Sequence, residues 1–434
     1  MMIITLAHND ALFEVEVEEG EEPAVLLMQA FSLTSIPPHH QLLALPNRPP
    51  LTASNLPPRL DLAPGTVVVV MEGGPGEAAA PPAGACSAVA EAVVLQPTPA
   101  LAAAYPAHME GIQRMQQRLL ASAAAVMAYE EPAAVAEALE AIPVAELHAR
   151  ARGAEKPQPT FRLQLLLELL RWFRADFFKW VNAPPCGVCG QATSAVGRAA
   201  PTPEERAGQA GVVEVYRCGS CGAMTRFPRY NNPRTLLKWR KGRCGEWANC
   251  FTLCCRAMGF DARQVVDWTD HVWTEVYSPH HHRWLHLDAC ETAFDSPLMY
   301  ESGWGKKLSY VVGFGRDNVV DVTRRYTKRL PEVMTRRTAV PEAWLASAVA
   351  ALDARQKRVS KASPGRRAAL ASIARHEARE LQRSVAFDTG VRKEDEMQGR
   401  ISGSLQWRAV RGELGEAAEA AAGAGSSGGS TPAP

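Results

Sequence analysis

The chain has 434 residues, of which 47% are hydrophobic and 21% charged, and its formal net charge at pH 7 is +1. This length allows two or three domains, and the composition is that of a soluble globular protein. A charge so close to zero gives no reason to expect a nucleic-acid or membrane partner, and the absence of an 18-residue apolar run predicts no transmembrane helix.

The N-terminal sequence and the cysteine content indicate a reducing compartment. Residues 1–10 have no basic segment ahead of an apolar run, so they do not resemble a secretory signal peptide. The ten cysteines of such a chain are better explained by metal binding and catalysis than by disulfides.

Residues 1–72 predict a small β-rich domain. Met2–Leu6 and Leu12–Val17 are expected as short strands, and Pro23–Leu33 fits a helix with a proline near its first turn. Val67–Met71 is a later apolar strand. This order predicts a β-grasp, ubiquitin-like fold, and the alternative is an unrelated small α+β domain.

Residues 73–106 are rich in Gly, Pro and Ala and predict a flexible linker. The chain then turns helical, and Phe161–Trp180 is expected to form one longer helix with an apolar stripe. Residues 107–328 are predicted to form the core domain, which contains the two groups of candidate functional residues described next.

Two CxxC pairs form the clearest metal signal in the chain. Four thiolates match the tetrahedral preference of Zn²⁺, and each tight turn directs two sulfur atoms to one point. Redox pairs or plain core cysteines are the alternatives. Four protein ligands leave no open position, so the zinc is expected to be structural and to clamp one lobe against the neighbouring helix. The predicted ligands are Cys186, Cys189, Cys218 and Cys221.

Cys244 is the candidate nucleophile. Gly242 and Gly245 interrupt regular structure, and the apolar residues after them recur at helical spacing as far as a stop at Gly259. A thiol at a helix N-terminus has a lowered pKa, and the thiolate is the form that attacks a carbonyl.

His271 and Asp288 are the candidate partners of Cys244. Each lies in a segment with the period-two alternation of a strand. An imidazole can take the thiol proton and return it to a leaving group, while a carboxylate fixes the tautomer of the ring. The plain alternative is that each of the three is an ordinary core residue, because order alone is weak evidence.

Beyond the core, residues 329–412 predict a helical C-terminal extension, and residues 413–434 predict a disordered tail of Ala, Gly, Ser and Pro. His280–His282 follows a Ser-Pro pair between two strands. A solvated hairpin turn therefore explains these histidines better than a metal site.

Three segments, Gly242–Asn249, Asp270–Trp273 and Leu287–Glu291, together resemble the catalytic core of cytosolic peptide:N-glycanases, which belong to the transglutaminase-like superfamily. Leu170–Asn182 and Gly399–Ser404 are also similar to that family. The resemblance implies an α+β chain with a papain/transglutaminase-like core, a zinc module of four cysteines, the ubiquitin-like domain and the helical extension.

The resemblance also implies an activity. It is cleavage of the amide between asparagine and N-acetylglucosamine in misfolded N-glycoproteins, through a Cys244-His271-Asp288 triad and a thioester, in support of ER-associated degradation. In that family the glutamate at the position of Glu291 helps to hold the sugar core. Trp273 and Trp172 are further candidates for contact with substrate.

The implied location is cytoplasmic, with the nucleus as a second compartment. The implied partners are unfolded glycoproteins and proteasome-shuttle or AAA-ATPase proteins. The alternatives in other classes are a protein-crosslinking transglutaminase, a non-catalytic member of the DNA-repair branch, and a glycan-binding adaptor. The cysteine at position 244 argues against the non-catalytic classes, and the double CxxC motif argues against the crosslinking enzyme.

Overall fold

The structure is a computed structural model. It describes a discontinuous N-terminal part and two continuous later parts. The predicted linker, apart from residues 105 and 106, and the predicted tail from residue 416 onward lie outside the described residues. The described residues are 2–8, 11–18, 23–34, 41–45, 51, 57, 62, 66–72, 105–383 and 394–415.

The chain divides into two compact units, residues 1–121 with 338–359 and residues 122–337 with 360–434. The first unit contains a four-stranded sheet of order β2-β1-β4-β3, in which β1 and β4 are parallel. Ile4, Leu26 and Val68 belong to its hydrophobic core. The elements are β1 (Met2–His8), β2 (Ala11–Val17), α1 (Pro23–Thr34), β3 (Gln41–Ala44), β4 (Val67–Glu72) and, after residue 337, α12 (Glu342–Val359).

Strand β3 was not expected from the sequence, whereas the two N-terminal strands, the helix and the late strand lie where they were predicted. The assignment of this domain as ubiquitin-like stays a prediction.

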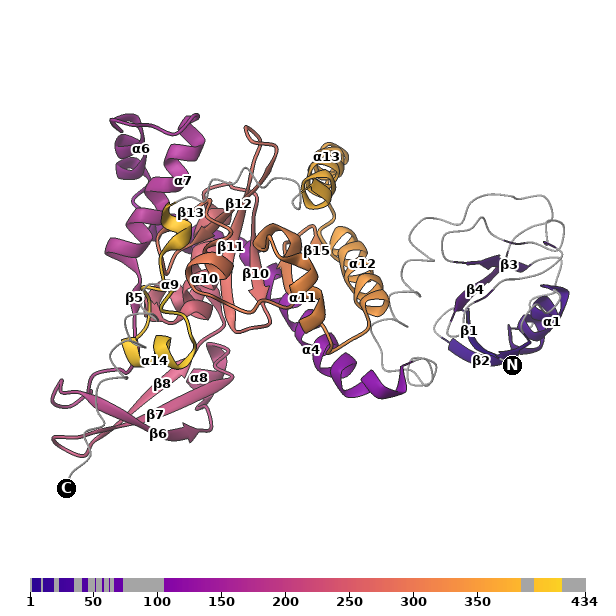
Figure 1. Cartoon of the computed structure of the whole chain (residues 1–434), viewed down its shortest axis with the longest axis horizontal. Coiled ribbons are helices and arrows are strands. Elements are labelled where there is room, and N and C mark those ends of the chain that lie inside the picture. Colours follow the sequence, from indigo (N-terminus) through magenta and orange to yellow (C-terminus); the bar gives the residue numbers. More distant parts are fainter. Residues whose placement is uncertain are drawn as a thin grey trace, which may run out of the picture. The chain divides into compact units, whose positions relative to one another are not determined.

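The second unit is built on a six-stranded antiparallel sheet of order β13-β12-β11-β10-β14-β15 (Figure 1). The strands predicted around His271 and Asp288 are confirmed, because these residues begin β11 and end β12. The strands are β10 (Ala262–Asp267), β11 (His271–Ser278), β12 (Arg283–Asp288), β13 (Ala293–Phe294), β14 (Val311–Phe314) and β15 (Val319–Asp321).

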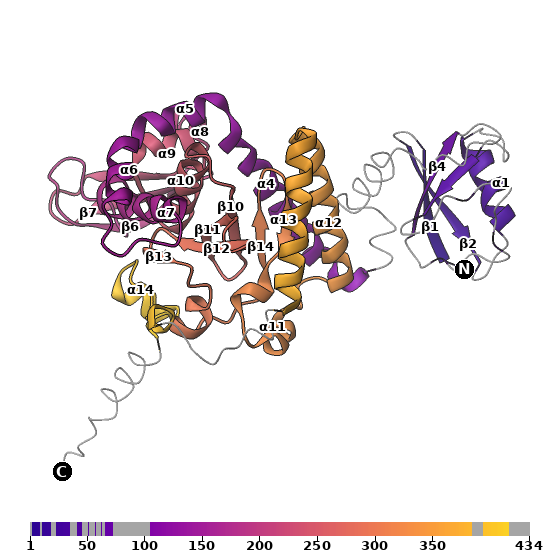
Figure 2. The ribbon, with the colours of Figure 1, turned by 90° about the horizontal axis from the view of Figure 1, so that it is seen from above.

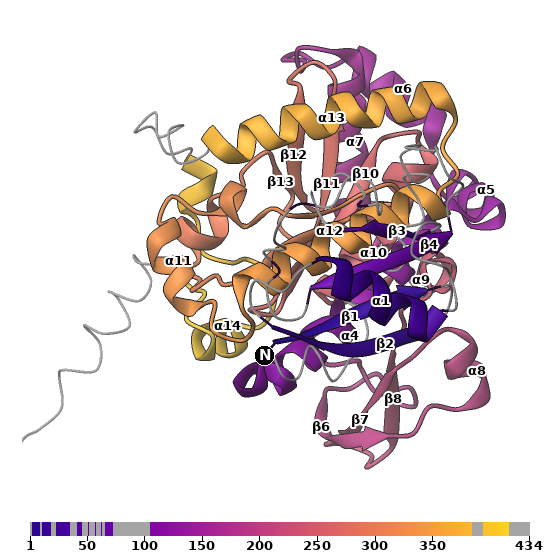
Figure 3. The same ribbon diagram turned by 90° about the vertical axis from the view of Figure 1, so that its right-hand side faces the viewer.

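The two faces of this sheet are covered by different helices. Helix α10 (Cys244–Ala257) packs against one face, where the hydroxyls of Thr252 and Thr274 lie 2.8 Å apart. Helix α13 (Pro364–Arg383) lies against the sheet (Figure 2 and Figure 3). Its Ile373 packs with Tyr277 and Trp284.

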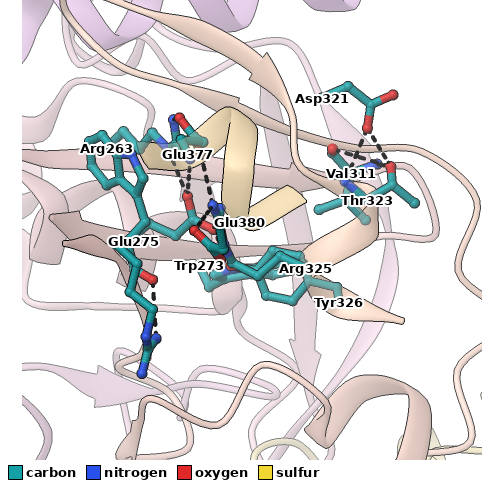
Figure 4. A network of polar contacts seen from close by, with 12 residues as sticks. Arg263, Trp273, Glu275, Val311, Asp321, Thr323, Arg325, Tyr326, Glu377 and Glu380 are labelled. Atoms are coloured by element: carbon teal, nitrogen blue, oxygen red, sulfur yellow. Dashed lines mark hydrogen bonds and ion pairs between the residues drawn. The ribbon is translucent and has the colours of Figure 1, made fainter. Parts of the chain in front are cut away.

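A buried network of charges joins α13 to the sheet (Figure 4). Glu275 of β11 binds Arg263 and Arg325, and both arginines also bind Glu377 of α13. The hydroxyl of Tyr326 donates to Glu275 at 2.5 Å. The side chains of these two arginines and two glutamates are at most 5% exposed, so each charge depends on its partners for compensation.

The helix predicted over Phe161–Trp180 is shorter than expected. Helix α7 (Phe161–Trp172) continues as a π-helical turn to Phe177, and Lys179–Trp180 forms strand β5. Strand β5 pairs in parallel with β9 (Lys241–Gly242), so local helix propensity is overridden by pairing with a segment that lies far along the chain. This pairing places Trp180 beside the residues that lead into Cys244.

The predicted metal-binding segment forms a three-stranded antiparallel sheet of order β6-β7-β8. Its strands are β6 (Thr193–Ala199), β7 (Val212–Cys218) and β8 (Met224–Arg229). The other helices are α4 (Met109–Ala125), α5 (Pro132–Ala141), α6 (Val144–Arg152), α8 (Pro203–Ala207), α9 (Pro233–Trp239), α11 (Leu330–Arg336) and α14 (Leu405–Val410).

Within the described residues, no single helix has the length and apolar composition needed to cross a membrane. One bent pair, Pro106–Glu130 with Pro132–Ala141, meets these criteria only when the two helices are taken together.

The charge network yields a stability prediction. Glu377→Ala leaves Arg263 and Arg325 short of a carboxylate in the protein interior, so we expect a loss of about 3–5 kcal/mol in the free energy of unfolding. The measurement is urea unfolding followed by far-ultraviolet circular dichroism. Arg379→Ala, an exposed position on the same helix, is the control and should change stability by less than about 0.5 kcal/mol. Equal effects of the two changes would contradict the assignment.

Candidate active site

Cys244 is the first residue of helix α10 and is partly exposed. The carboxylate of Glu246 in the first turn accepts a hydrogen bond from the backbone N–H of Arg243 at 3.0 Å. Gly242 permits this turn, because a Cβ at that position would lie 2.4 Å from the Cβ of Glu246. The sulfur therefore lies at a helix N-terminus, where the unpaired N–H groups and the helix dipole favour the thiolate.

His271 and Asp288 meet at the ends of adjacent strands. Nε2 of His271 lies 2.7 Å from Oδ2 of Asp288, and both side chains are almost fully buried. Nδ1 of His271 is buried and has no hydrogen-bond partner among the described residues. The Cys244 thiol and this ring interact through their charges, and Nδ1 is the ring nitrogen available to the thiol because Nε2 is engaged by Asp288.

Asp288 is itself held by three donors. Its Oδ1 accepts from the backbone N–H of Cys290 at 3.0 Å, and its Oδ2 accepts from the Tyr300 hydroxyl at 3.0 Å as well as from His271. His286 Nδ1 accepts from the backbone N–H of Ser296, so its proton is assigned to Nε2, which donates to the Tyr300 oxygen at 2.7 Å. This relay leaves Asp288 little freedom to turn away from His271.

The electrostatics favour a charged pair of thiolate and imidazolium. Burial alone would raise the pKa of the Cys244 thiol, but the neighbouring His271 and the positive charge of Arg400 hold this pKa below its usual value. Burial alone would lower the pKa of His271, but Asp288 overcomes it and raises the pKa of the ring. Burial opposes ionisation of Asp288 too, yet His271 lowers its pKa to about 2.

Two expected substrate contacts are placed differently by the structure. Trp273 is 1% exposed, stacks on Tyr300 and donates to the Tyr326 hydroxyl at 2.7 Å. It is therefore a core residue behind His271 rather than a wall open to substrate. Both carboxylate oxygens of Glu291 accept backbone N–H groups, from Ile401 at 2.8 Å and Ser402 at 3.1 Å, so Glu291 anchors a C-terminal segment.

Trp172 is 6% exposed and lies against Phe177. It borders an open groove of about 420 Å³ that also has carboxylates and guanidinium groups on its walls. This mixture of aromatic and polar side chains is compatible with a sugar ligand. The other lining residues are Ala141, Pro143, Glu146, Arg150, Asp176, Phe177 and Arg240.

Sequence reasoning gave no role to Arg400, which the structure places near the site. Its charge acts on Cys244, His271 and Asp288, although all three lie much earlier in the chain. The similarity over Gly399–Ser404 was the one signal that could have indicated it. Trp180 was also missed, because the sequence suggested a helix there.

The four predicted metal ligands lie together. Cys189 Sγ is 3.5 Å from Cys218 Sγ and 3.4 Å from Cys221 Sγ, and Cys186 Sγ is 3.6 Å from Cys221 Sγ. All four sulfur atoms lie within 4.8 Å of one another. Tetrahedral coordination at a metal–sulfur distance of about 2.3 Å gives sulfur separations of about 3.8 Å. The cluster can therefore hold a metal ion.

Two arginine–glutamate pairs connect the sheet that carries the cysteines to the start of α10. Arg229 of β8 binds both carboxylate oxygens of Glu246, at 2.5 and 2.8 Å. Arg243, just before Cys244, binds both oxygens of Glu214 on β7, at 2.9 and 2.7 Å. The position of the nucleophile is thus coupled to the fold of the cysteine-bearing sheet.

Comparisons with known families agree with this architecture. The family model of the transglutaminase-like superfamily matches residues 192–289. The model of the Rad4 transglutaminase-like domain matches residues 266–382. The core is therefore of the transglutaminase-like class.

Individual relatives narrow the class. The chain is 48% identical over 301 residues to the Homo sapiens peptide-N(4)-(N-acetyl-beta-glucosaminyl)asparagine amidase, a match that covers 67% of this chain and 45% of the relative. It is 42% identical over 287 residues to the Yarrowia lipolytica protein of that name, covering 64% of this chain and 78% of the relative. The chain belongs to this amidase family, and it spans about half the length of the human relative.

Among solved structures, one similar chain is from the crystal structure of Rad4-Rad23 crosslinked to an undamaged DNA. The similarity has a TM-score of 0.40 at 13% identity and covers 63% of this chain and 58% of the other.

The relay behind Asp288 gives a prediction for this site. Tyr300→Phe keeps the ring that stacks on Trp273 but leaves buried Asp288 and His286 one hydrogen bond short each, so we expect a loss of about 1–3 kcal/mol in unfolding free energy. The measurement is chemical denaturation monitored by tryptophan fluorescence. Tyr230→Phe, at a half-buried tyrosine outside the relay, should leave the midpoint nearly unchanged. Wild-type stability of Tyr300→Phe would contradict the relay.

Proposed function

We propose that this chain hydrolyses the amide bond between an asparagine side chain and N-acetylglucosamine in N-glycoproteins. The observation that supports this best is the partly exposed Cys244 thiol at a helix N-terminus, beside a buried imidazole that is hydrogen-bonded to a carboxylate. Such an arrangement provides a nucleophile and a general acid–base for acyl transfer. The names of these relatives identify the amide that they cleave.

In the first half of the reaction the Cys244 thiolate attacks the side-chain carbonyl of the asparagine. The negative charge passes from sulfur to the carbonyl oxygen, and the backbone N–H of Cys244 is one donor available to it at the helix start. The carbon–nitrogen bond breaks when the His271 imidazolium gives its proton to the departing glycosylamine. A thioester between Cys244 and the side chain remains.

In the second half water hydrolyses the thioester. Neutral His271 takes a proton from the water, which attacks the thioester carbon, and the Cys244 sulfur leaves. The products are aspartate in place of asparagine and a free glycosylamine. Asp288 holds the ring in one tautomer and stabilises its charged form in both halves.

The substrates we propose are unfolded N-glycoproteins. Cys244 is only partly exposed, so an asparagine side chain on an extended segment can reach it more readily than one fixed in a folded surface. The groove beside Trp172 is the candidate site of sugar contact. We further propose that the protein acts in the cytosol, and also in the nucleus, where it helps to clear misfolded glycoproteins with proteasome-shuttle or AAA-ATPase partners. The nine described cysteines form no disulfide, which supports a reducing compartment.

We propose that the cysteine cluster holds one Zn²⁺. Four thiolates at tetrahedral separations suit zinc, and backbone N–H groups of Val188 and Ser220 approach the sulfurs of Cys186 and Cys218 at 3.4 Å. When bound, the ion supplies structural stability and no chemistry, since all four positions are taken by protein. It would fix the sheet whose Glu214 and Arg229 hold the start of α10.

The proposed activity predicts the behaviour of a nucleophile variant. Cys244→Ala should release no glycan from a denatured glycoprotein, because no thioester can form, while wild type releases it with one new aspartate per site. The measurement is a gel shift together with peptide mass spectrometry. Cys255→Ala, at a buried thiol on the same helix, is the matched control and should retain activity if it folds.

Absence of glycan release by correctly folded, metal-loaded wild type would overturn the amidase proposal. Undiminished release by Cys244→Ala would show that another residue is the nucleophile.

Removal of the metal tests the cluster. We expect one zinc per chain by elemental analysis, and a lowered melting temperature after chelation, because metal-binding free energy contributes to folding. Cys221→Ser should lose the metal and show the same loss of stability, whereas Cys290→Ser should keep it. An unchanged melting temperature after verified metal removal would contradict a structural role.

A further inference from the structure

The C-terminal segment 394–415 returns to the active site and is fixed on both sides of it. Glu291, three residues after Asp288, accepts the backbone N–H groups of Ile401 and Ser402. Arg411 donates to the Asp270 carboxylate at 2.7 Å, next to His271. The segment also packs closely on Gly303, where a Cβ would lie 2.2 Å from the carbonyl oxygen of Gln398.

Within this segment, the side chain of Arg400 is buried in the protein interior. It is 1% exposed. Its Nη1 donates to Glu413 at 2.8 Å and its Nε donates to Ser402 Oγ at 3.0 Å. Its Nη2 is buried without a partner among the described residues. A buried guanidinium nitrogen without a partner is costly, so a negative group that approaches Nη2 would be stabilised there.

Aromatic rings place this guanidinium next to the triad. Its Cζ lies 4.7 Å from the ring centre of Trp304, and the His271 ring lies 4.9 Å from the same indole. The ring centres of Trp407 and Trp180 lie 4.4 and 5.7 Å from the same Cζ. The rings exclude water, which strengthens the action of the charge at short range.

We propose that Arg400 supplies the fixed positive charge that stabilises the Cys244 thiolate and the negative charge that develops when this thiolate attacks. It is a positioning residue, since it acts through the charge of the sulfur and no bond to Arg400 forms or breaks. The inference rests on the proposed function in taking Cys244 as the nucleophile.

The charges around the sulfur make such a cation useful. Burial and the negative charge of Asp270 both raise the pKa of Cys244 and so oppose formation of a thiolate. His271 and Arg400 act in the opposite sense and lower the pKa of Cys244, and Arg400 also lowers the pKa of Asp288. Unlike His271, which gives up its proton during the reaction, Arg400 remains charged throughout.

The rival explanation is that Arg400 matters only through its ion pair with Glu413, which would hold the segment in place. Substitution of each partner separates the two explanations. Loss of Arg400 removes both the pair and the positive charge near Cys244. Loss of the Glu413 carboxylate removes the pair but leaves the positive charge uncompensated.

The test is the pH dependence of alkylation of Cys244 by iodoacetamide in the metal-loaded full chain, followed on the Cys244 peptide by mass spectrometry. This rate reports the thiolate fraction and needs no glycoprotein. Arg400→Gln should raise the midpoint by about one pH unit, so that alkylation below the wild-type midpoint is about tenfold slower. Arg400→Lys should retain most of the wild-type behaviour because it keeps the charge.

Glu413→Gln should leave the midpoint unchanged or lower it. An unchanged midpoint in Arg400→Gln would overturn the proposal, and so would an equal rise in Glu413→Gln, which would assign the effect to the ion pair. If Arg400→Gln does not fold, the double variant Arg400→Gln/Glu413→Gln removes both buried charges and should show the same raised midpoint.

Glycan release then separates this inference from the proposed function. If wild type is an amidase, Arg400→Gln should lower kcat about tenfold with a smaller change in KM, and its pH optimum should move upward. If wild type releases no glycan, the proposed function fails, while the alkylation profile still decides the role of Arg400.

Discussion

The hydrogen bond between His271 and Asp288 is the constraint on which the proposed chemistry depends. At 2.7 Å and almost fully buried, it joins the first residue of one strand to the last residue of its neighbour. Antiparallel pairing of β11 with β12 therefore determines the position of the imidazole. Because Asp288 is ionised and held by Tyr300 and a backbone N–H, the ring can become positively charged inside the protein, where an unpaired imidazole would stay neutral.

The nucleophile is positioned by separate interactions of longer range. Arg243 and Glu246 flank Cys244 and bind Glu214 and Arg229 of the cysteine-bearing sheet. On the other side, the segment containing Arg400 is anchored by Glu291 and Arg411. The cysteine-bearing sheet, the strands that carry His271 and Asp288, and the segment that contains Arg400 thus meet around Cys244. Helix α13 stabilises these strands through the ion pairs of Glu377 with Arg263 and Arg325.

Local features of the sequence predicted much of this structure. The start of α10 at Cys244, strands β11 and β12 and the four clustered cysteines follow from glycine placement, alternation and short spacings. Features set by tertiary contacts were beyond such patterns. Trp180 lies in strand β5, which pairs with β9, and not in the predicted helix. Trp273 is buried in the core, and the Glu291 carboxylate binds the backbone of a segment 110 residues away. No local sequence pattern predicted a role for Arg400, since most of the residues around it come from distant parts of the chain.

The thiolate content of the resting protein tests the central claim most directly. The measurement is the ultraviolet thiolate absorbance of the metal-loaded wild type minus that of Cys244→Ala, as a function of pH, repeated in a His271→Gln background. We predict one thiolate that persists below the usual range of a cysteine pKa and that shifts upward by more than about one unit without His271. A wild-type Cys244 that ionises like an ordinary cysteine, with no change on loss of His271, would contradict the account.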